Sequence, residues 1–160
     1  MKKFILLIVF CTFYNSLNAK SVSCEFEEVY QNGETHHGFF LLQNNQLRYE
    51  YYNNSLYTLL YLNEKMFIAN NSEKNKIQLI QDNDILIPEL IEIYSKFPKI
   101  KSKYKLKNYD IIIEKNKKFI KRLVIKSNDL NLSIYLINCN FNSIEKKYLN
   151  FNPILPYVFN

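Results

Sequence analysis

The sequence predicts a mainly β fold in which a curled antiparallel meander forms an unclosed barrel, with a short helix lidding its concave face. Three observations lead to this prediction. Short segments of alternating apolar and polar residues recur along the chain, and a few polar residues separate each segment from the next. Such connections are too short for parallel crossovers, so neighbouring strands should run antiparallel. One segment near the middle instead places its apolar residues at helical spacing.

Residues 1–19 have the organisation of a secretory signal peptide. Lys2 and Lys3 give a positive start, a short apolar run follows from Phe4 to Tyr14, and Ala19 is a small residue before the expected cleavage point. The run falls short of the roughly 20 apolar residues that cross a bilayer, which favours a cleaved signal over a membrane anchor. Residues 20–160 are then short enough for a single domain. We therefore expect an exported protein.

Two cysteines, Cys24 and Cys139, remain after removal of the signal. An even number of cysteines in an oxidising compartment favours a disulfide, which would join the first strand to a late one. The alternative is a pair of separately buried thiols.

The mature chain is expected to start with a strand in which Val22, Cys24 and Phe26 share one face. Strands then follow one another closely, and in residues 38–62 almost every face is apolar. A sheet normally exposes one face to water, so this sheet needs cover on its second side. The expected strands span residues 21–31, 38–43, 46–52, 55–62, 65–70, 76–81, 108–115, 119–127 and 129–141.

Residues 88–97 are expected to form the helix. Leu90, Ile93, Tyr94 and Phe97 recur at helical spacing, and Pro88 suits the first helical turn. The apolar face of this helix needs a surface to pack on, and the concave side of the sheet is the available one.

The strand that faces this helix should present Leu47, Tyr49 and Tyr51, because the alternate set contains Arg48 and Glu50. In strand 55–62 both alternate sets are apolar. Tyr57, Leu59 and Tyr61 on one side and Leu56 and Leu60 on the other are therefore equally suited to face inward.

The order of these motifs resembles the LolA family of periplasmic carriers of outer-membrane lipoproteins. The resemblance rests on Gly33 and Gly38 before an FFLL strand, the run Leu47–Tyr51, Met66-Phe67, and the proline-led helix. It covers residues 26–97 well and the later strands only in pattern. It implies a half-barrel that takes up lipoprotein acyl chains, with an inner-membrane release complex and an outer-membrane acceptor as partners.

An apolar half-barrel can bind acyl chains or another lipid without polar contacts, since each buried methylene contributes roughly 0.8 kcal/mol. The expected lid is the helix. The alternative is that the aromatic residues pack as an ordinary core around no cavity. The expected cavity residues are Leu47, Tyr49, Tyr51, Phe67, Leu90, Ile93, Tyr94 and Phe97.

Arg48 is a candidate for holding the lid or contacting a partner, because the resemblance marks its position. The alternative is an arginine on the convex face paired with an acid of a neighbouring strand, which would contribute about 0–1 kcal/mol at a surface.

Motifs for catalysis are absent from the sequence. His36 and His37 are adjacent, so on a strand they point to opposite faces and cannot hold one metal ion together. There is no serine elbow and no glycine-rich phosphate loop. We therefore expect neither an enzyme nor a cofactor or metal site, and the scattered basic residues do not predict nucleic-acid binding.

Two other classes of protein fit part of the pattern. Export, strand alternation and 16% aromatic residues are also found in small outer-membrane β-barrels, although the helix and the charged strands argue against one. An exported binding module with a solid core and no lipid cargo is the other alternative.

Overall fold

The computed structural model describes residues 21–81, 86–151 and 153–159. The expected signal peptide, residues 1–19, lies outside the described residues.

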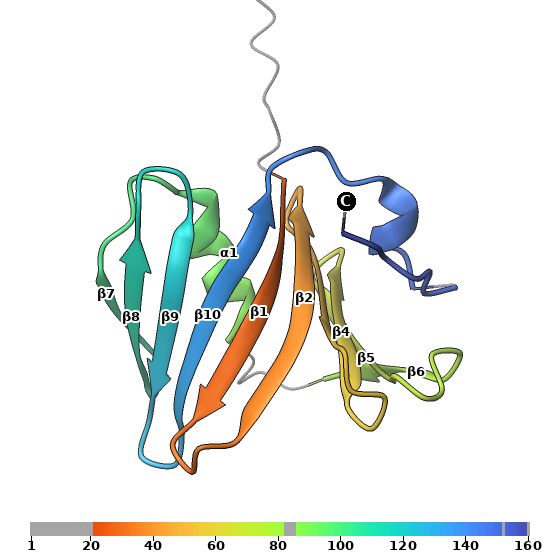
Figure 1. Cartoon of the computed structure of the whole chain (residues 1–160), viewed down its shortest axis with the longest axis horizontal. Coiled ribbons are helices and arrows are strands. Elements are labelled where there is room, and N and C mark those ends of the chain that lie inside the picture. The colour runs from red at the N-terminus through yellow and green to blue at the C-terminus, as the bar shows by residue number, and fades with distance from the viewer. Residues whose placement is uncertain (1–20, 82–85, 152, 160) are drawn as a thin grey trace, which may run out of the picture.

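The described chain is mainly β, as predicted, and its strands form one unclosed antiparallel sheet with one α-helix, α1 (Ile87–Ser95) (Figure 1). No described helix has the length and apolar character needed to cross a membrane. The strands are β1 (Val22–Tyr30), β2 (Thr35–Gln43), β3 (Gln46–Tyr51), β4 (Tyr57–Leu62), β5 (Lys65–Asn70), β6 (Ile77–Ile80), β7 (Lys103–Leu106), β8 (Tyr109–Lys115), β9 (Ile120–Lys126) and β10 (Asn131–Asn140).

Two meanders lie side by side in this sheet. Its strand order is β6-β5-β4-β3-β2-β1-β10-β9-β8-β7, so β1 pairs with both β2 and β10. Strands β6 and β7 form the two edges of the described sheet. The chain passes from the first meander to the second through α1, which Figure 1 shows behind β9, β10 and β1. The helix therefore lies against one face of the sheet while the other face points toward the viewer.

The tight hairpin turns depend on residues that accept positive φ angles. Asn44 and Asn45 have φ angles of 53° and 60°, and Asn63 and Glu64 have 51° and 62°. A two-residue turn of the type I′ needs positive φ at both positions, because its twist then matches that of the two strands. Asparagine tolerates this conformation better than most residues. These turns fix the registers of β2 with β3 and of β4 with β5.

Gly38 leaves room for the ring of Phe26 on the concave face. A Cβ atom at this position would lie 2.5 Å from the Phe26 ring and 2.1 Å from the carbonyl oxygen of Glu50. The Phe26 ring stacks on Tyr49 with its centroid 4.1 Å away. A side chain at residue 38 would displace this stack from the middle of the concave face.

The predicted disulfide joins Cys24 of β1 to Cys139 of β10, with Cα atoms 4.1 Å apart. It closes the seam where the two meanders meet, beside an irregularity in the β1–β10 register. A disulfide is compatible with an exported protein.

The convex face carries a cover that the sequence did not predict. After β10, the chain folds back as a 3₁₀ helix (Lys146–Leu149) and an irregular segment beside β2 to β5 (Figure 1). Ile144 and Leu149 pack on β2, and Ile154 packs on β4 and β5. The apolar residues on both faces of 38–62 are thus covered by different parts of the chain. Helix α1 lies on the concave side, and residues 144–151 and 153–159 lie on the convex side.

Candidate functional site

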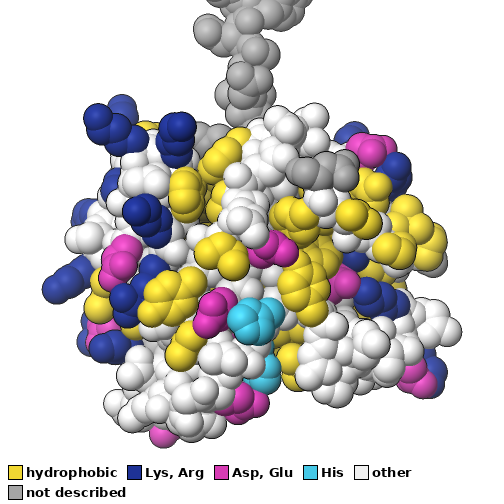
Figure 2. Space-filling view, in the orientation of Figure 1, with side chains coloured by type: hydrophobic (Ala, Val, Ile, Leu, Met, Phe, Trp, Pro, Cys, Tyr) yellow, Lys and Arg dark blue, Asp and Glu magenta, His cyan; other side chains and the backbone are white. Residues whose placement is uncertain are grey.

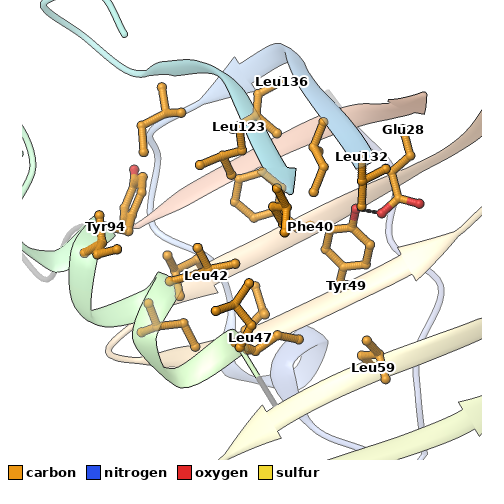
Figure 3. Close-up of a pocket in the computed structure, with 18 of the residues that line it drawn as sticks. Glu28, Phe40, Leu42, Leu47, Tyr49, Leu59, Tyr94, Leu123, Leu132 and Leu136 are labelled. Carbon is orange, nitrogen blue, oxygen red and sulfur yellow. Dashed lines mark hydrogen bonds between the residues drawn. The ribbon is translucent and has the colours of Figure 1, made fainter. Parts of the chain in front are cut away.

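A pocket of about 360 Å³ lies between the concave face of the sheet and α1. It is partly open to solvent, and its wall is almost entirely aliphatic and aromatic (Figure 3). Its volume falls in the range of small-molecule pockets, about 300–1,000 Å³. Both meanders contribute to the wall, so the site depends on the β1–β10 seam. The wall is formed by Glu28, Tyr30, Phe40, Leu42, Leu47, Tyr49, Tyr51, Tyr57, Leu59, Leu86, Ile87, Leu90, Ile91, Ile93, Tyr94, Tyr109, Ile113, Ile120, Leu123, Ile125, Leu130, Leu132, Ile134 and Leu136.

The structure places three of the expected sheet residues, Leu47, Tyr49 and Tyr51, in the pocket wall. It also decides the face of β4 that the sequence left open. Tyr57 and Leu59 line the pocket, and the alternate residues of β4 point to the convex side.

The helix supplies Leu90, Ile93 and Tyr94 to the pocket, together with Ile87 and Ile91, which were not expected there. Phe97 follows the helix and belongs to the same apolar core, but it is not part of the pocket wall. Burial raises the pKa of Tyr94 to about 12, so its phenol stays neutral at the edge of the pocket.

Phe67 lies on the opposite face of the sheet from the pocket, and its expected place in the cavity is wrong. Its ring stacks on Phe151 of the C-terminal segment with the centroids 4.6 Å apart. Both alternate sets of β5 are apolar, so alternation alone could not assign its face. The register settles the question, because Phe67 pairs with Leu60 on the convex side.

Arg48 also lies on the convex face and does not contact the lid. It is not an exposed arginine either, since its exposed fraction is 0%. Its Nε donates to Glu50 at 2.9 Å, and its Nη1 donates to the carbonyl oxygen of Tyr148 at 3.0 Å. Its guanidinium lies 5.2 Å from the centre of the Phe39 ring. The convex position and the acidic partner agree with the alternative expectation, but the acid lies on the same strand and the pair is buried. Arg48 also fastens the C-terminal segment to the sheet.

One polar group interrupts the apolar wall. Glu28, on β1, is 3% exposed, and its carboxylate accepts hydrogen bonds from three tyrosine hydroxyls. Tyr49 donates to Oε1 at 2.6 Å, and Tyr30 and Tyr51 each donate to Oε2 at 2.9 Å. Figure 3 shows the bond from Tyr49. No lysine or arginine is found among the described residues of the wall, so this carboxylate is held by phenols alone.

The three phenols remain neutral donors at physiological pH. The pKa values of Tyr30, Tyr49 and Tyr51 are all raised above the usual value for tyrosine, first by burial and then by the negative charge of Glu28. Each phenol therefore keeps the proton that it donates, and the carboxylate keeps its three donors.

Sequence reasoning missed Glu28 and the wall contributed by β8 to β10. The signal for Glu28 was present, because Cys24, Phe26 and Glu28 fall on one face when the alternation of β1 is continued. Residues such as Leu123 and Leu132 carry no such signal, because only the pairing of β10 with β1 brings their strands beside the first meander.

In the comparisons with known proteins, no family model matches this chain, and no curated protein matches it.

The described lining of the pocket suits the binding of a largely apolar ligand. Within the part of the chain that the structure describes, no group of three or more His, Cys, Asp or Glu residues could hold a metal ion. The pocket offers apolar contact along most of its wall and a single hydrogen-bonded carboxylate. Such a site discriminates ligands by apolar length and by charge at one end.

Proposed function

We propose that this protein is a periplasmic carrier that binds the acyl chains of lipoproteins, or of a related lipid, for transfer to the outer membrane. The observation that carries the proposal is the open apolar pocket between the sheet and α1. Burying about ten methylenes would contribute roughly 8 kcal/mol, from which the cost of immobilising the chain is subtracted. The motif order that resembles the LolA family supports the same function.

Glu28 limits the kinds of lipid that the pocket would accept. A carboxylate without a neighbouring cation repels an anionic head group at its end of the pocket. Acyl chains linked as esters or amides to a larger molecule avoid this repulsion, whereas the carboxylate of a free fatty acid does not. The site therefore favours the acyl chains of a lipoprotein or phospholipid over free fatty acids.

The helix α1 is the part of the wall that moves when cargo enters. It has nine residues and no side-chain cap at its start. Apart from apolar contacts, Glu89 of the helix lies 3.4 Å from Lys107 in the turn between β7 and β8, in an ion pair that water partly reaches. Elements held by few, partly exposed contacts open at lower free-energy cost than the strands of a sheet. Partners at the two membranes, an inner-membrane release complex and an outer-membrane acceptor, would act on this closure.

Replacing Leu123 with tryptophan should weaken lipid binding by at least about tenfold. Leu123 is half-buried in the middle of the pocket wall (Figure 3), so the larger ring fills space that acyl carbons would occupy. Excluding two methylenes costs about 1.6 kcal/mol, which is on the order of tenfold in affinity. The measurement is a titration of the purified protein with a phospholipid that carries a fluorescent acyl chain.

The matched control is Leu79→Trp, which makes the same exchange at a position that is 46% exposed on the convex side of β6. Its affinity should equal that of the wild type. Circular dichroism and urea unfolding establish that both variants fold. A folded Leu123→Trp variant that binds the probe as tightly as the control would show that the pocket is not the acyl site.

A further inference from the structure

Positive charge is concentrated in one part of the sheet. Residues 99–126 contain eleven lysine and arginine residues and two acids, a net charge of +9 (11 − 2). The rest of residues 20–160 contains eight basic and thirteen acidic residues, a net charge of −5 (8 − 13). The small overall net charge is therefore the sum of a strongly positive segment and a negative remainder. We call residues 99–126, which hold β7, β8, β9 and their turns, the basic wing.

The cations of the basic wing face water. All are exposed except Arg122, which is half-buried. Figure 2 shows dark blue side chains gathered over this side of the molecule, at the left. Some have local partners, such as Lys105 with Asp110 and Arg122 with Glu114. Others make no ion pair with any described residue, and these are Lys99, Lys101, Lys103, Lys117, Lys118, Lys121 and Lys126.

Protection of the sheet edge explains only part of this pattern. Lysines on an exposed edge strand prevent pairing with other chains, and Lys103 and Lys105 on β7 suit that role. Lys117 and Lys118 lie instead in the turn between β8 and β9, and Lys121 lies on β9, which is paired on both sides. Their charge calls for another explanation.

We propose that the basic wing docks the protein on the anionic surface of a phospholipid membrane. Ten of its eleven cations are lysines, whose compact, mobile charges suit a diffuse layer of head groups. Interfaces between proteins are instead depleted in lysine and enriched in arginine. The inner face of the same strands lines the pocket, through Ile113, Leu123 and Ile125. Docking therefore brings the pocket close to the bilayer that holds acyl chains. The basic wing would dock in this way whether or not the pocket holds cargo.

Sedimentation with vesicles tests the proposal. The wild-type protein should bind vesicles of phosphatidylcholine that contain about one third phosphatidylglycerol, and should not bind vesicles of phosphatidylcholine alone. Each lysine near the surface contributes about 1 kcal/mol. The triple variant Lys117→Glu/Lys118→Glu/Lys121→Glu should therefore bind on the order of 100-fold more weakly. Raising the salt from about 0.1 M to about 1 M should release the wild type, because the screening length falls from about 10 Å to about 3 Å.

The matched control is Lys65→Glu/Lys76→Glu/Lys146→Glu, which changes the net charge equally at exposed lysines outside the wing. It should lose no more than a few-fold. Equal losses in the two triple variants would overturn the proposal, as would binding that needs no anionic lipid. Binding to soluble polyglutamate but not to anionic vesicles would identify an acidic protein as the partner and would also overturn it. Failure of acyl binding to the pocket would leave these outcomes unchanged, so the two proposals are tested separately.

Discussion

Replacing both Cys24 and Cys139 with alanine should lower the free energy of unfolding by about 4–5 kcal/mol. The bond closes a loop of 115 residues, and in the chain-entropy model the loss of such a link frees the unfolded chain by about this amount. The bond also joins β1 to β10, the single pairing that unites the two meanders of the described sheet. Urea unfolding of the oxidised wild type and of the variant measures the difference.

Reduction provides the control for this experiment. Dithiothreitol should destabilise the wild type and leave the alanine variant unchanged. Because Cys24 is only 1% exposed, its replacement by alanine also removes a small amount of packing. The difference in unfolding free energy between the oxidised and the reduced wild type contains only the effect of the disulfide bond. Comparing it with the loss in the alanine variant therefore separates the effect of the bond from the effect of packing. A difference below about 1 kcal/mol would mean that the seam is held by its strand pairing alone.

Replacing Glu50 with glutamine should cost about 3 kcal/mol of stability. Arg48 is 0% exposed, and Glu50 is its described ion-pair partner. Removing one member of a buried pair leaves an uncompensated charge, which costs about 3–5 kcal/mol. Glutamine still accepts a hydrogen bond, so the lower end of that range is expected. Thermal and urea unfolding measure the loss, and proteolysis of the C-terminal segment should become faster because Arg48 holds Tyr148.

Two further variants separate charge from packing at this site. Lys74 also bonds to Glu50, but its side chain is 30% exposed, so Lys74→Met should cost less than about 1 kcal/mol. The double variant Arg48→Met/Glu50→Met removes both buried charges and should be more stable than Glu50→Gln alone. If Glu50→Gln costs no more than Lys74→Met, Arg48 is not the buried anchor that we describe.

Much of the fold could be predicted from local pattern. The alternation of β1 to β6 and of β8 to β10, the asparagine turns and the helical spacing of α1 are all signals within a few residues of one another. Strand β7 could not be predicted, because its four residues, KYKL, are too few to establish an alternation of apolar and polar side chains. The joining of two meanders through β1 and β10 is a contact between distant segments, and short-range pattern does not encode it.

The site was harder to predict because several strands are apolar on both faces. Leu47, Tyr49 and Tyr51 could be oriented because their neighbours are charged, whereas Phe67 could not. The charged set was expected to meet water, yet the segment after β10 buries Arg48 and Glu50. That segment lacks strand or helix periodicity, so its role as a cover follows only from its contacts, such as those of Leu149 and Ile154.

The central claim is that the pocket holds acyl chains, and native mass spectrometry of the expressed, folded protein tests it most directly. We predict that the wild type carries an additional mass that matches one or more acylated lipids and that denaturation releases. The Leu79→Trp variant should carry the same mass, and the Leu123→Trp variant should carry much less. A wild-type protein that is folded and disulfide-bonded but shows only the mass of its own chain, and takes up no lipid when lipid is added, would contradict the account.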